Sequence, residues 1–143
     1  MNYLIYVSQA ERPMTSEELA GILEQSRAYN HKDGMTGLLI YKDDAEERRA
    51  YFMQVLEGEK PVLDATFKRI AADRRHHTKV ILEEGKIDAR NFPDWSMGFR
   101  NVEPGDFEAF DGYADLGSDA FWTRAQAGDL SGSLELMRSF YEG

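Results

Sequence analysis

The 143-residue chain contains no cysteine, and this absence narrows its chemistry. Disulfides, thiolate catalysis and cysteine-ligated zinc are all excluded, a pattern typical of cytoplasmic proteins. No apolar run approaches the roughly 20 residues needed to cross a bilayer. The N-terminal stretch MNYLIYVSQ also lacks the basic segment and long apolar stretch of a signal peptide. We therefore expect a cytoplasmic protein with no membrane partner.

Positive charge is scarce as well, since the formal net charge is −9. This argues against a nucleic-acid partner, because binding to nucleic acid depends on Lys and Arg neutralising phosphates. The charge is also uneven along the chain. Residues 1–100 carry 17 acidic and 15 basic side chains, whereas residues 101–143 carry 9 acidic and 2 basic ones. The sequence therefore predicts a nearly neutral domain over residues 1–100 and an acidic extension over residues 101–143.

Common enzyme motifs are missing too. Neither of the phosphate-binding patterns GxGxxG and GxxxxGK occurs, and no hydroxyl nucleophile stands with a His and an acid in a strand-turn context. His76 and His77 follow Asp73, but adjacent histidines at a helix end do not easily face one ion, so we expect no metal site. The sequence does not indicate an enzyme.

The hydrophobic pattern predicts an α+β domain with the order βαββαβ and one added strand. A capping box of Thr15 and Glu18 begins the first helix, which is expected to continue to about Asn30. The charged run Lys42–Arg49 is interpreted as a solvated hairpin loop. Two helices on one face of a mostly antiparallel sheet give a ferredoxin-like architecture. The strands are expected at 3–8, 35–41, 51–57, 79–83 and 95–99, and the second helix begins near Pro61.

The acidic extension is expected to add two amphipathic helices. One is capped by Ser118 and ends at Gly128, and the other begins at about Ser131. Each has an apolar stripe that needs a surface to cover. We expect both to pack on or near the sheet face that the first two helices leave free.

Gln54 is the unusual residue of the expected core. It lies within the apolar strand FMQVL, and the period of 2 places it on the same face as Phe52 and Leu56. A buried primary amide without partners costs about 1–3 kcal/mol, so its donors and acceptors must meet partners inside the protein. A purely structural amide, bonded to backbone, remains an alternative.

Four other residues join Gln54 as candidates, each with a structural alternative. Tyr6 lies on the face of the first strand opposite Ile5 and Val7, and a buried phenol also needs a partner. Asn30, near a helix end, suits either a C-terminal cap or a ligand contact. Trp95 and Met97 are expected to share one face of the last strand, where they serve either packing or function.

As an ordered set, these residues resemble the BLUF family, the flavin-binding blue-light sensor domains. The resemblance covers about residues 2–100. It rests on the stretches LIYVSQA (4–10), NHKDGMTGLLIY (30–41), FMQVLEG (52–58), RIAADRRHH (69–77) and RNFPDWSMGF (90–99).

The resemblance implies a flavin between the two helices, usually FAD, with FMN and riboflavin as alternatives. Tyr6 would be the light-driven donor of an electron and a proton, and the amide of Gln54 would rearrange its hydrogen bonds. Asn30 would hold the carbonyl edge of the ring. The other matches to flavin-neighbouring positions are Ser26, Asp73, Arg75 and His76, and the matches to signal-relay positions are Trp95 and Met97.

Two departures from the family accompany the resemblance. Tyr29 stands where many members carry a second asparagine, so one ring contact is either absent or made by the phenol. The 42–49 loop is longer than usual. We expect a stand-alone, non-enzymatic photoreceptor that signals through its C-terminal helices to a second copy, as a homodimer or higher oligomer, or to a downstream protein. A flavin-dependent redox enzyme and a flavin-free ferredoxin-like interaction module are the alternatives.

Overall fold

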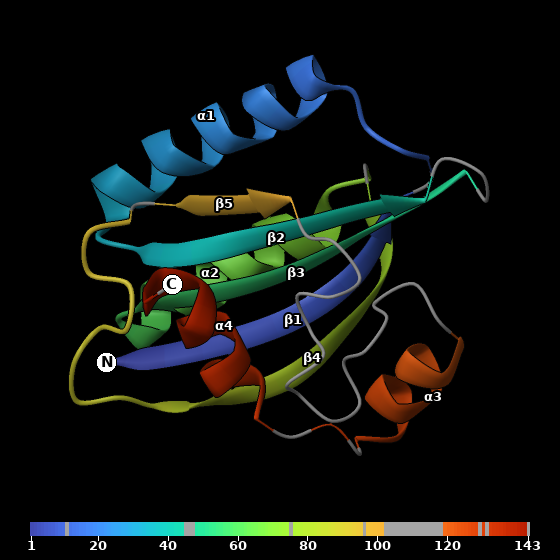
Figure 1. Ribbon diagram of the computed structural model, residues 1–143. Coiled ribbons are helices and arrows are strands. Elements are labelled where there is room, and N and C mark those ends of the chain that lie inside the picture. The colour runs from blue at the N-terminus through green and yellow to red at the C-terminus, as the bar shows by residue number, and fades with distance from the viewer. Residues whose placement is uncertain are drawn as a thin grey trace.

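The computed structural model describes residues 1–10, 12–44, 48–74, 76–95, 97–101, 119–128, 130 and 132–142. The element order βαββαββ, followed by two helices, confirms the predicted α+β ferredoxin-like fold (Figure 1). The strands are β1 (Asn2–Ala10), β2 (Thr36–Asp44), β3 (Arg49–Gly58), β4 (His76–Lys86) and β5 (Gly98–Asn101). The helices are α1 (Ser16–Asp33), α2 (Lys60–Ala72), α3 (Asp119–Ala127) and α4 (Ser133–Glu142).

The strands form one sheet in the order β4-β1-β3-β2-β5. All neighbouring pairs are antiparallel except β2 and β5, which run parallel. The β1–β3 pairing keeps one register from Asn2↔Gly58 to Ala10↔Ala50. This register sets Tyr6 directly opposite Gln54 in the two strands at the middle of the sheet.

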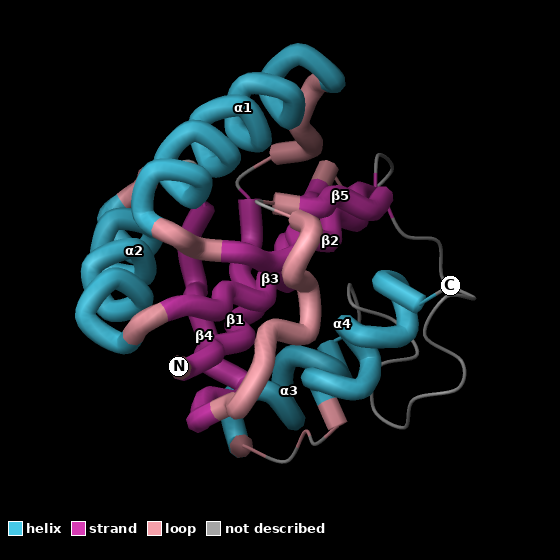
Figure 2. Tube along the Cα trace, turned by 90° about the vertical axis from the view of Figure 1, so that its left-hand side faces the viewer, coloured by secondary structure: helices cyan, strands magenta, loops and turns pink. Residues whose placement is uncertain are grey.

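Helices cover both faces of the sheet, as Figure 2 shows. The pair α1 and α2 lies on one face, here called the helix-pair face, and α3 and α4 lie on the other, here called the tail face. The expected position of the C-terminal helices is therefore confirmed. None of the helices in the described ranges is long and apolar enough to cross a membrane.

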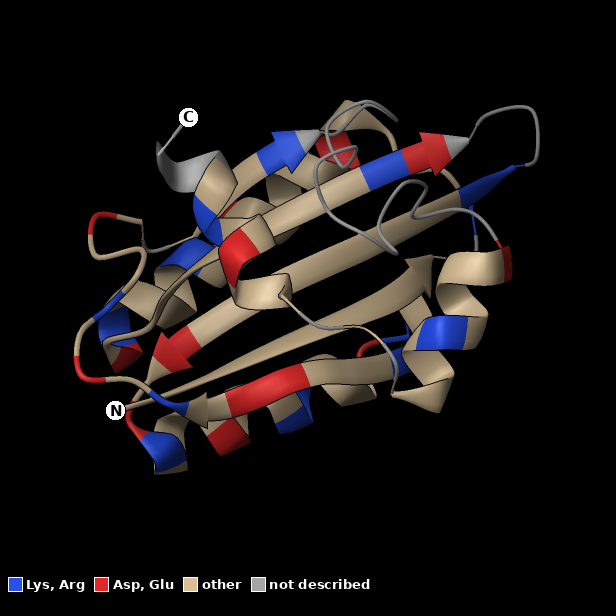
Figure 3. Cartoon of the chain, turned by 60° about the horizontal axis from the view of Figure 1, so that its bottom comes forward, with Lys and Arg blue, Asp and Glu red and all other residues tan. Residues whose placement is uncertain are grey.

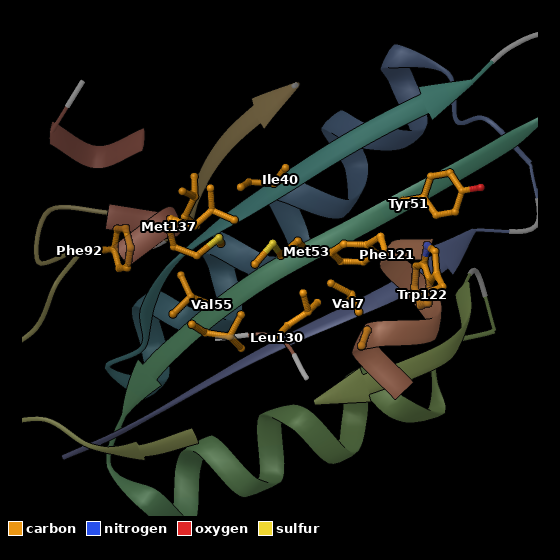
Figure 4. Close-up of a cluster of buried hydrophobic side chains, with 14 residues drawn as sticks. Val7, Ile40, Tyr51, Met53, Val55, Phe92, Phe121, Trp122, Leu130 and Met137 are labelled. Carbon is orange, nitrogen blue, oxygen red and sulfur yellow. The ribbon is translucent and has the colours of Figure 1, made fainter. Parts of the chain in front are cut away.

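The tail face holds a hydrophobic core, drawn in Figure 4. Side chains from the central strands meet side chains from α3 and α4 there, and most of them have less than a tenth of their surface exposed. This tail-face core consists of Ile5, Val7, Leu38, Ile40, Tyr51, Met53, Val55, Phe92, Phe121, Trp122, Ala125, Leu130, Leu136 and Met137.

Helix α1 begins where the sequence predicts. The Thr15 Oγ1 accepts the Glu18 N–H at 3.1 Å, and the Glu18 carboxylate accepts the Thr15 N–H at 3.1 Å, which completes the capping box. The predicted end near Asn30 falls short of the observed one, because α1 continues to Asp33. Gly34 adopts the left-handed conformation (φ 72°) and closes the helix, so Asn30 belongs to the last turn and does not cap it.

Other boundaries differ from the prediction as well, among them those of β4, which runs from His76 to Lys86 rather than over 79–83. Asp44 pairs with Arg49, so the β2–β3 hairpin is tighter than the expected 42–49 loop, of which residues 45–47 lie outside the described residues. Strand β5 begins at Gly98 rather than Trp95. Gly128 (φ 74°) ends α3 as predicted, while Ser118 and Ser131, the expected starts of the last two helices, lie outside the described residues.

Candidate functional site

A pocket lies on the helix-pair face, with walls from the sheet and from both helices of the pair. It contains about 730 Å³ of empty space, its open mouth included. The predicted flavin-contacting residues Tyr6, Ser26, Asn30, Gln54, Asp73 and His76 all line it. Arg75 lies outside the described residues.

Tyr6 and Gln54 form a buried hydrogen-bonded pair on the floor of this pocket. Their side chains are 3 % and 4 % exposed. The Tyr6 hydroxyl donates to Gln54 Oε1, and Gln54 Nε2 donates to Met97 Sδ at 3.3 Å. The amide oxygen therefore bonds to Tyr6 and the amide nitrogen bonds to Met97, which makes a hydrogen-bond chain in the order Tyr6–Gln54–Met97. Strand β1 carries no Lys, Arg, Asp or Glu, and β3 carries none between Ala50 and Leu56 (Figure 3).

The Tyr6 phenol is held in its protonated form. Burial raises its pKa above the ordinary value of 10.0, and the negative charge of Asp73 raises the pKa further. The Tyr6 ring packs edge-on against Phe67 with 5.5 Å between ring centres. Tyr6 is thus a neutral phenol that carries a proton and points it at an amide oxygen.

Helix α1 supplies two polar groups to the pocket. Ser26 and Asn30 are four residues apart, so they lie one above the other on the same helix face. Asn30 is only 2 % exposed, which is uncommon for an amide on a helix that borders solvent. Asn30 lies in the last turn of α1 and lines the pocket, while Gly34 is the C-cap residue.

His76 occupies the β4 side of the pocket and is fixed by the protein. Its Nδ1 lies 2.6 Å from Ser8 Oγ, and its Nε2 lies 3.0 Å from the carbonyl oxygen of Ile70. A carbonyl oxygen only accepts, so Nε2 carries the hydrogen and, in the neutral ring, Nδ1 accepts from the Ser8 hydroxyl. Both ring nitrogens of His76 are therefore bonded to the wall of the pocket.

Trp95 and Met97 do not share a face, and that prediction is wrong. Met97 is 2 % exposed and belongs to the helix-pair face, where it meets Gln54. Trp95 packs against the tail-face core and stacks on Phe92 at 6.1 Å. The physical reason is that β5 begins only at Gly98, so the alternation of a strand does not apply to the two residues. The indole lies on Gly98, where a Cβ atom would approach Trp95 Cε3 to 2.3 Å.

Sequence reasoning missed part of the α2 wall. Thr66 and Arg69 line the pocket together with Asp73, and Thr66 is 2 % exposed. Positions 66, 69 and 73 follow the spacing i, i+3, i+7 of one helix face, and that signal was available in the sequence. The Arg69 guanidinium also lies 4.0 Å from the centre of the Tyr29 ring, a cation–π contact that joins α2 to α1.

The described residues hold no group of three or more His, Asp and Glu side chains that could bind a metal ion. The polar groups of the pocket are instead three amides, two phenols, two hydroxyls, an imidazole, a guanidinium and a carboxylate among apolar walls. This donor set suits a flat organic ligand with a polar edge.

Solved structures of similar fold extend over nearly the whole chain. The dark-state structure of BlrB, a BLUF protein, is 27% identical, covers 89% of this chain and 92% of its own, and has a TM-score of 0.66. The structure of photo-activated BlsA is 27% identical, covers 97% of this chain and 94% of its own, and has a TM-score of 0.70.

Curated relatives include large enzymes. The photoactivated adenylate cyclase subunit alpha of Euglena gracilis is 31% identical over 102 residues, which are 70% of this chain and 9% of that protein. The subunit beta from Euglena longa is also 31% identical, over 11% of its length. The chain thus spans only about a tenth of these relatives and shares their BLUF part alone.

The family model described as "Sensors of blue-light using FAD" matches residues 1–98, which is more than half of the chain. These residues include the pocket, the Tyr6–Gln54 pair and Met97. The chain therefore belongs to the BLUF family of blue-light sensors that use FAD.

Proposed function

We propose that this BLUF sensor works through Tyr6 and Gln54, without enzymatic activity of its own, and passes its signal from Met97 to the C-terminal helices. The observation that carries the proposal is the buried hydrogen-bond chain Tyr6–Gln54–Met97 on the pocket floor.

The pocket residues fit the flavin ring of FAD by their chemistry. When bound, FAD supplies a ring that absorbs blue light and, once excited, accepts an electron. The carbonyl edge of such a ring needs donors, which Asn30, Gln54 and Arg69 offer, and its N–H needs an acceptor, which Asp73 offers. Apolar walls come from Ile22, Leu39, Leu56 and Ile70.

Tyr6 is the donor in this proposal. Loss of one electron makes a phenol strongly acidic, and the Tyr6 hydroxyl already points at Gln54 Oε1. Its proton therefore has a path to the amide oxygen without any movement of heavy atoms. The raised pKa keeps that proton in place until the electron leaves.

Gln54 is the switch. Rotation or tautomerisation of its amide exchanges donor and acceptor and leaves no net charge in the core. Met97 Sδ only accepts hydrogen bonds, so an amide that turns its oxygen toward Met97 loses this contact. Gln54 thereby converts a change of bonding in the pocket into a change at residue 97.

The output is proposed to run across the edge of the sheet. Met97 immediately precedes β5, while Trp95, two residues earlier, packs on the tail-face core that contains Leu136 and Met137 of α4. A shift of Met97 therefore reaches α4 through one short segment. In this proposal residues 1–100 sense light and residues 101–143 deliver the signal to a second copy of the chain or to another protein.

One absorption experiment tests the proposal. The purified protein, loaded with FAD, is expected to show a small reversible red shift of the flavin band under blue light. Gln54→Leu is expected to retain FAD and lose the shift, while Gln126→Leu, an exposed amide on α3, retains both. A Gln54→Leu protein that still shifts would remove Gln54 from the mechanism.

A further inference from the structure

The backbone at Met97 needs a partner that the sheet does not supply. The parallel ladder of β2 and β5 begins with the pair Leu38↔Gly98, one residue later. The carbonyl of Trp95 accepts the Gly37 N–H at 3.0 Å, but Met97 lies between that bond and the ladder. Its carbonyl oxygen accepts from Arg27 Nε at 2.9 Å instead. A side chain of α1 therefore supplies the donor for the Met97 carbonyl.

Arg27 follows Ser26, which lines the cofactor pocket. Successive residues of an α-helix point about 100° apart, so α1 presents Ser26 and Asn30 to the pocket and Arg27 to β5. The same helix thus contacts the cofactor site with one face and the backbone of Met97 with the next.

Open space adjoins Met97 on the β5 side. A second pocket of about 670 Å³, its open side included, is lined by Arg27, Asp94, Trp95, Met97, Gly98 and Phe99. A methionine side chain has three rotatable bonds and adapts readily to nearby space. The position of its sulfur therefore depends on how firmly the backbone of residue 97 is held.

We propose that Arg27 is a positioning residue that, through the carbonyl of Met97, keeps Met97 Sδ within hydrogen-bond reach of Gln54 Nε2. This inference rests on the proposed role of Gln54. Because the Nε2–Sδ contact is made in only one of the two amide arrangements, its loss favours the other arrangement. Arg27 thereby sets how fast the protein returns to the arrangement in which Gln54 contacts Met97.

The first test observes Met97 directly, in FAD-loaded protein kept in the dark. The chain has six methionines, and the methyl signal of Met97 in a ¹³C-methyl-methionine NMR spectrum is assigned by its loss in Met97→Leu. Arg27→Ala is expected to shift and broaden this signal and to leave those of Met53 and Met137 in the tail-face core unchanged. Arg27→Lys, which restores a donor, recovers most of the original signal.

Lys32→Ala is the matched control, since it removes the same charge from an exposed position of the same helix. It is expected to leave the Met97 signal unchanged. An unchanged Met97 signal in Arg27→Ala, or an equal change in Lys32→Ala, would overturn the proposal.

The second test is a double-mutant cycle on dark recovery after a blue flash. Arg27→Ala is expected to slow recovery about threefold or more. A rate change of this size corresponds to the loss of part of one weak hydrogen bond in the rate-limiting step. In a Met97→Leu background, where residue 97 has no sulfur to position, the same substitution is expected to have almost no effect. Unchanged or faster recovery in the single variant, or an equal effect in both backgrounds, would contradict the proposal.

The two tests separate this inference from the proposed function. If the unmodified protein gave no light-induced shift, the proposed function would fail, while the NMR signal in the dark would still report whether Arg27 holds Met97.

Discussion

The two faces of the sheet differ in kind, since one is packed with apolar side chains and the other includes a pocket with polar side chains. Alternate residues of the same strands supply both faces. In β3, Met53 and Val55 point into the tail-face core with no exposed surface, while Gln54 between them lines the pocket on the helix-pair face. In β1, Val7 and Tyr6 divide in the same way. The comparison teaches that one strand can supply close packing on one side and buried hydrogen-bonded polar side chains on the other, because successive side chains alternate.

The faces also differ in what fills them. The tail-face core is built from apolar side chains of the sheet, α3 and α4. The helix-pair face includes buried polar side chains and a pocket with an open mouth. Both faces hold a cluster of buried apolar side chains. We infer that the tail face serves packing alone, while the helix-pair face combines packing with a site. Four predictions test this division, from the largest expected effect to the smallest.

Neighbouring substitutions on β3 give the sharpest contrast. Met53→Ala empties a site in the tail-face core and is expected to cost about 2–5 kcal/mol of unfolding free energy. The red shift per bound FAD should survive in the fraction that folds. Gln54→Leu is expected to lose the shift at a smaller cost, about 1–3 kcal/mol, since it leaves the Tyr6 hydroxyl unpaired. Urea unfolding measures the free energy of unfolding, and absorption spectra measure the red shift. If folded, FAD-bound Met53→Ala lost the shift, the division between faces would be wrong.

Glu57 is a buried charged group on the tail face, a carboxylate with no exposed surface at the end of β3. It accepts the Thr36 hydroxyl at 2.8 Å and the backbone N–H groups of Asn91 (2.9 Å) and Phe92 (2.7 Å). Glu57→Gln sets an NH₂ group among these donors and is expected to cost about 1.5–3 kcal/mol in urea unfolding. Glu59→Gln, at an exposed position two residues later, is the control. Equal losses of unfolding free energy in the two variants would show that the buried hydrogen bonds of Glu57 contribute nothing to stability.

The capping box links stability to the pocket on the helix-pair face. Thr15→Ala removes the side-chain acceptor of the Glu18 N–H and is expected to cost about 0.5–2 kcal/mol. Because α1 carries Ser26 and Asn30, FAD should also dissociate faster, which dilution with fluorescence detection measures. Thr123→Ala, exposed within α3, is expected to leave FAD release unchanged. Equal rates of FAD release in both variants would show that the helix cap does not affect the pocket.

Strand β1 carries one tyrosine toward each face, and the raised pKa values of the two allow the faces to be compared by their dependence on pH. Burial raises the pKa of Tyr3 to about 12, with a further contribution from Glu83, whose carboxylate accepts the Tyr3 hydroxyl at 3.0 Å. Burial and then Asp73 also raise the pKa of Tyr6. In the unfolded protein both phenols ionise near pH 10.0, whereas in the folded protein they ionise at higher pH. Their contribution to the free energy of unfolding is therefore complete below pH 10.0 and declines as the pH rises toward 12.

Urea unfolding at a series of alkaline pH values measures this decline. Tyr3→Phe is expected to make the fall shallower by removing one of the two groups. A fall of the same steepness in Tyr3→Phe would show that Tyr3 takes no part in it.

The fold was predicted from short-range patterns, whereas the partnership of Tyr6 and Gln54 was predicted from the family resemblance. Alternation in FMQVL fixed the face of Gln54, and burial of an amide required a partner, which is Tyr6 across the strand pair. The spacing of apolar residues predicted the two helix layers. These features follow from local periodicity and from the need to satisfy buried polar groups.

What the sequence did not predict depends on contacts between distant segments. Trp95 and Met97 separate because β5 pairs with β2 only from Gly98 onward, and no local pattern marks that residue. The bonds of Glu57 to residues 91 and 92 and of Arg27 to Met97 join positions that the sheet brings together. Such contacts are decided by tertiary packing.

The central claim is that the Gln54 amide changes its hydrogen bonding when light is absorbed. A light-minus-dark infrared difference spectrum tests it most directly, with protein whose four glutamines carry ¹³C and ¹⁵N in the side-chain amide, compared with unlabelled protein. The account predicts isotope-sensitive difference bands that disappear in Gln54→Leu and persist in Gln126→Leu. A difference spectrum without glutamine isotope shifts, recorded while the flavin band still moves, would contradict it.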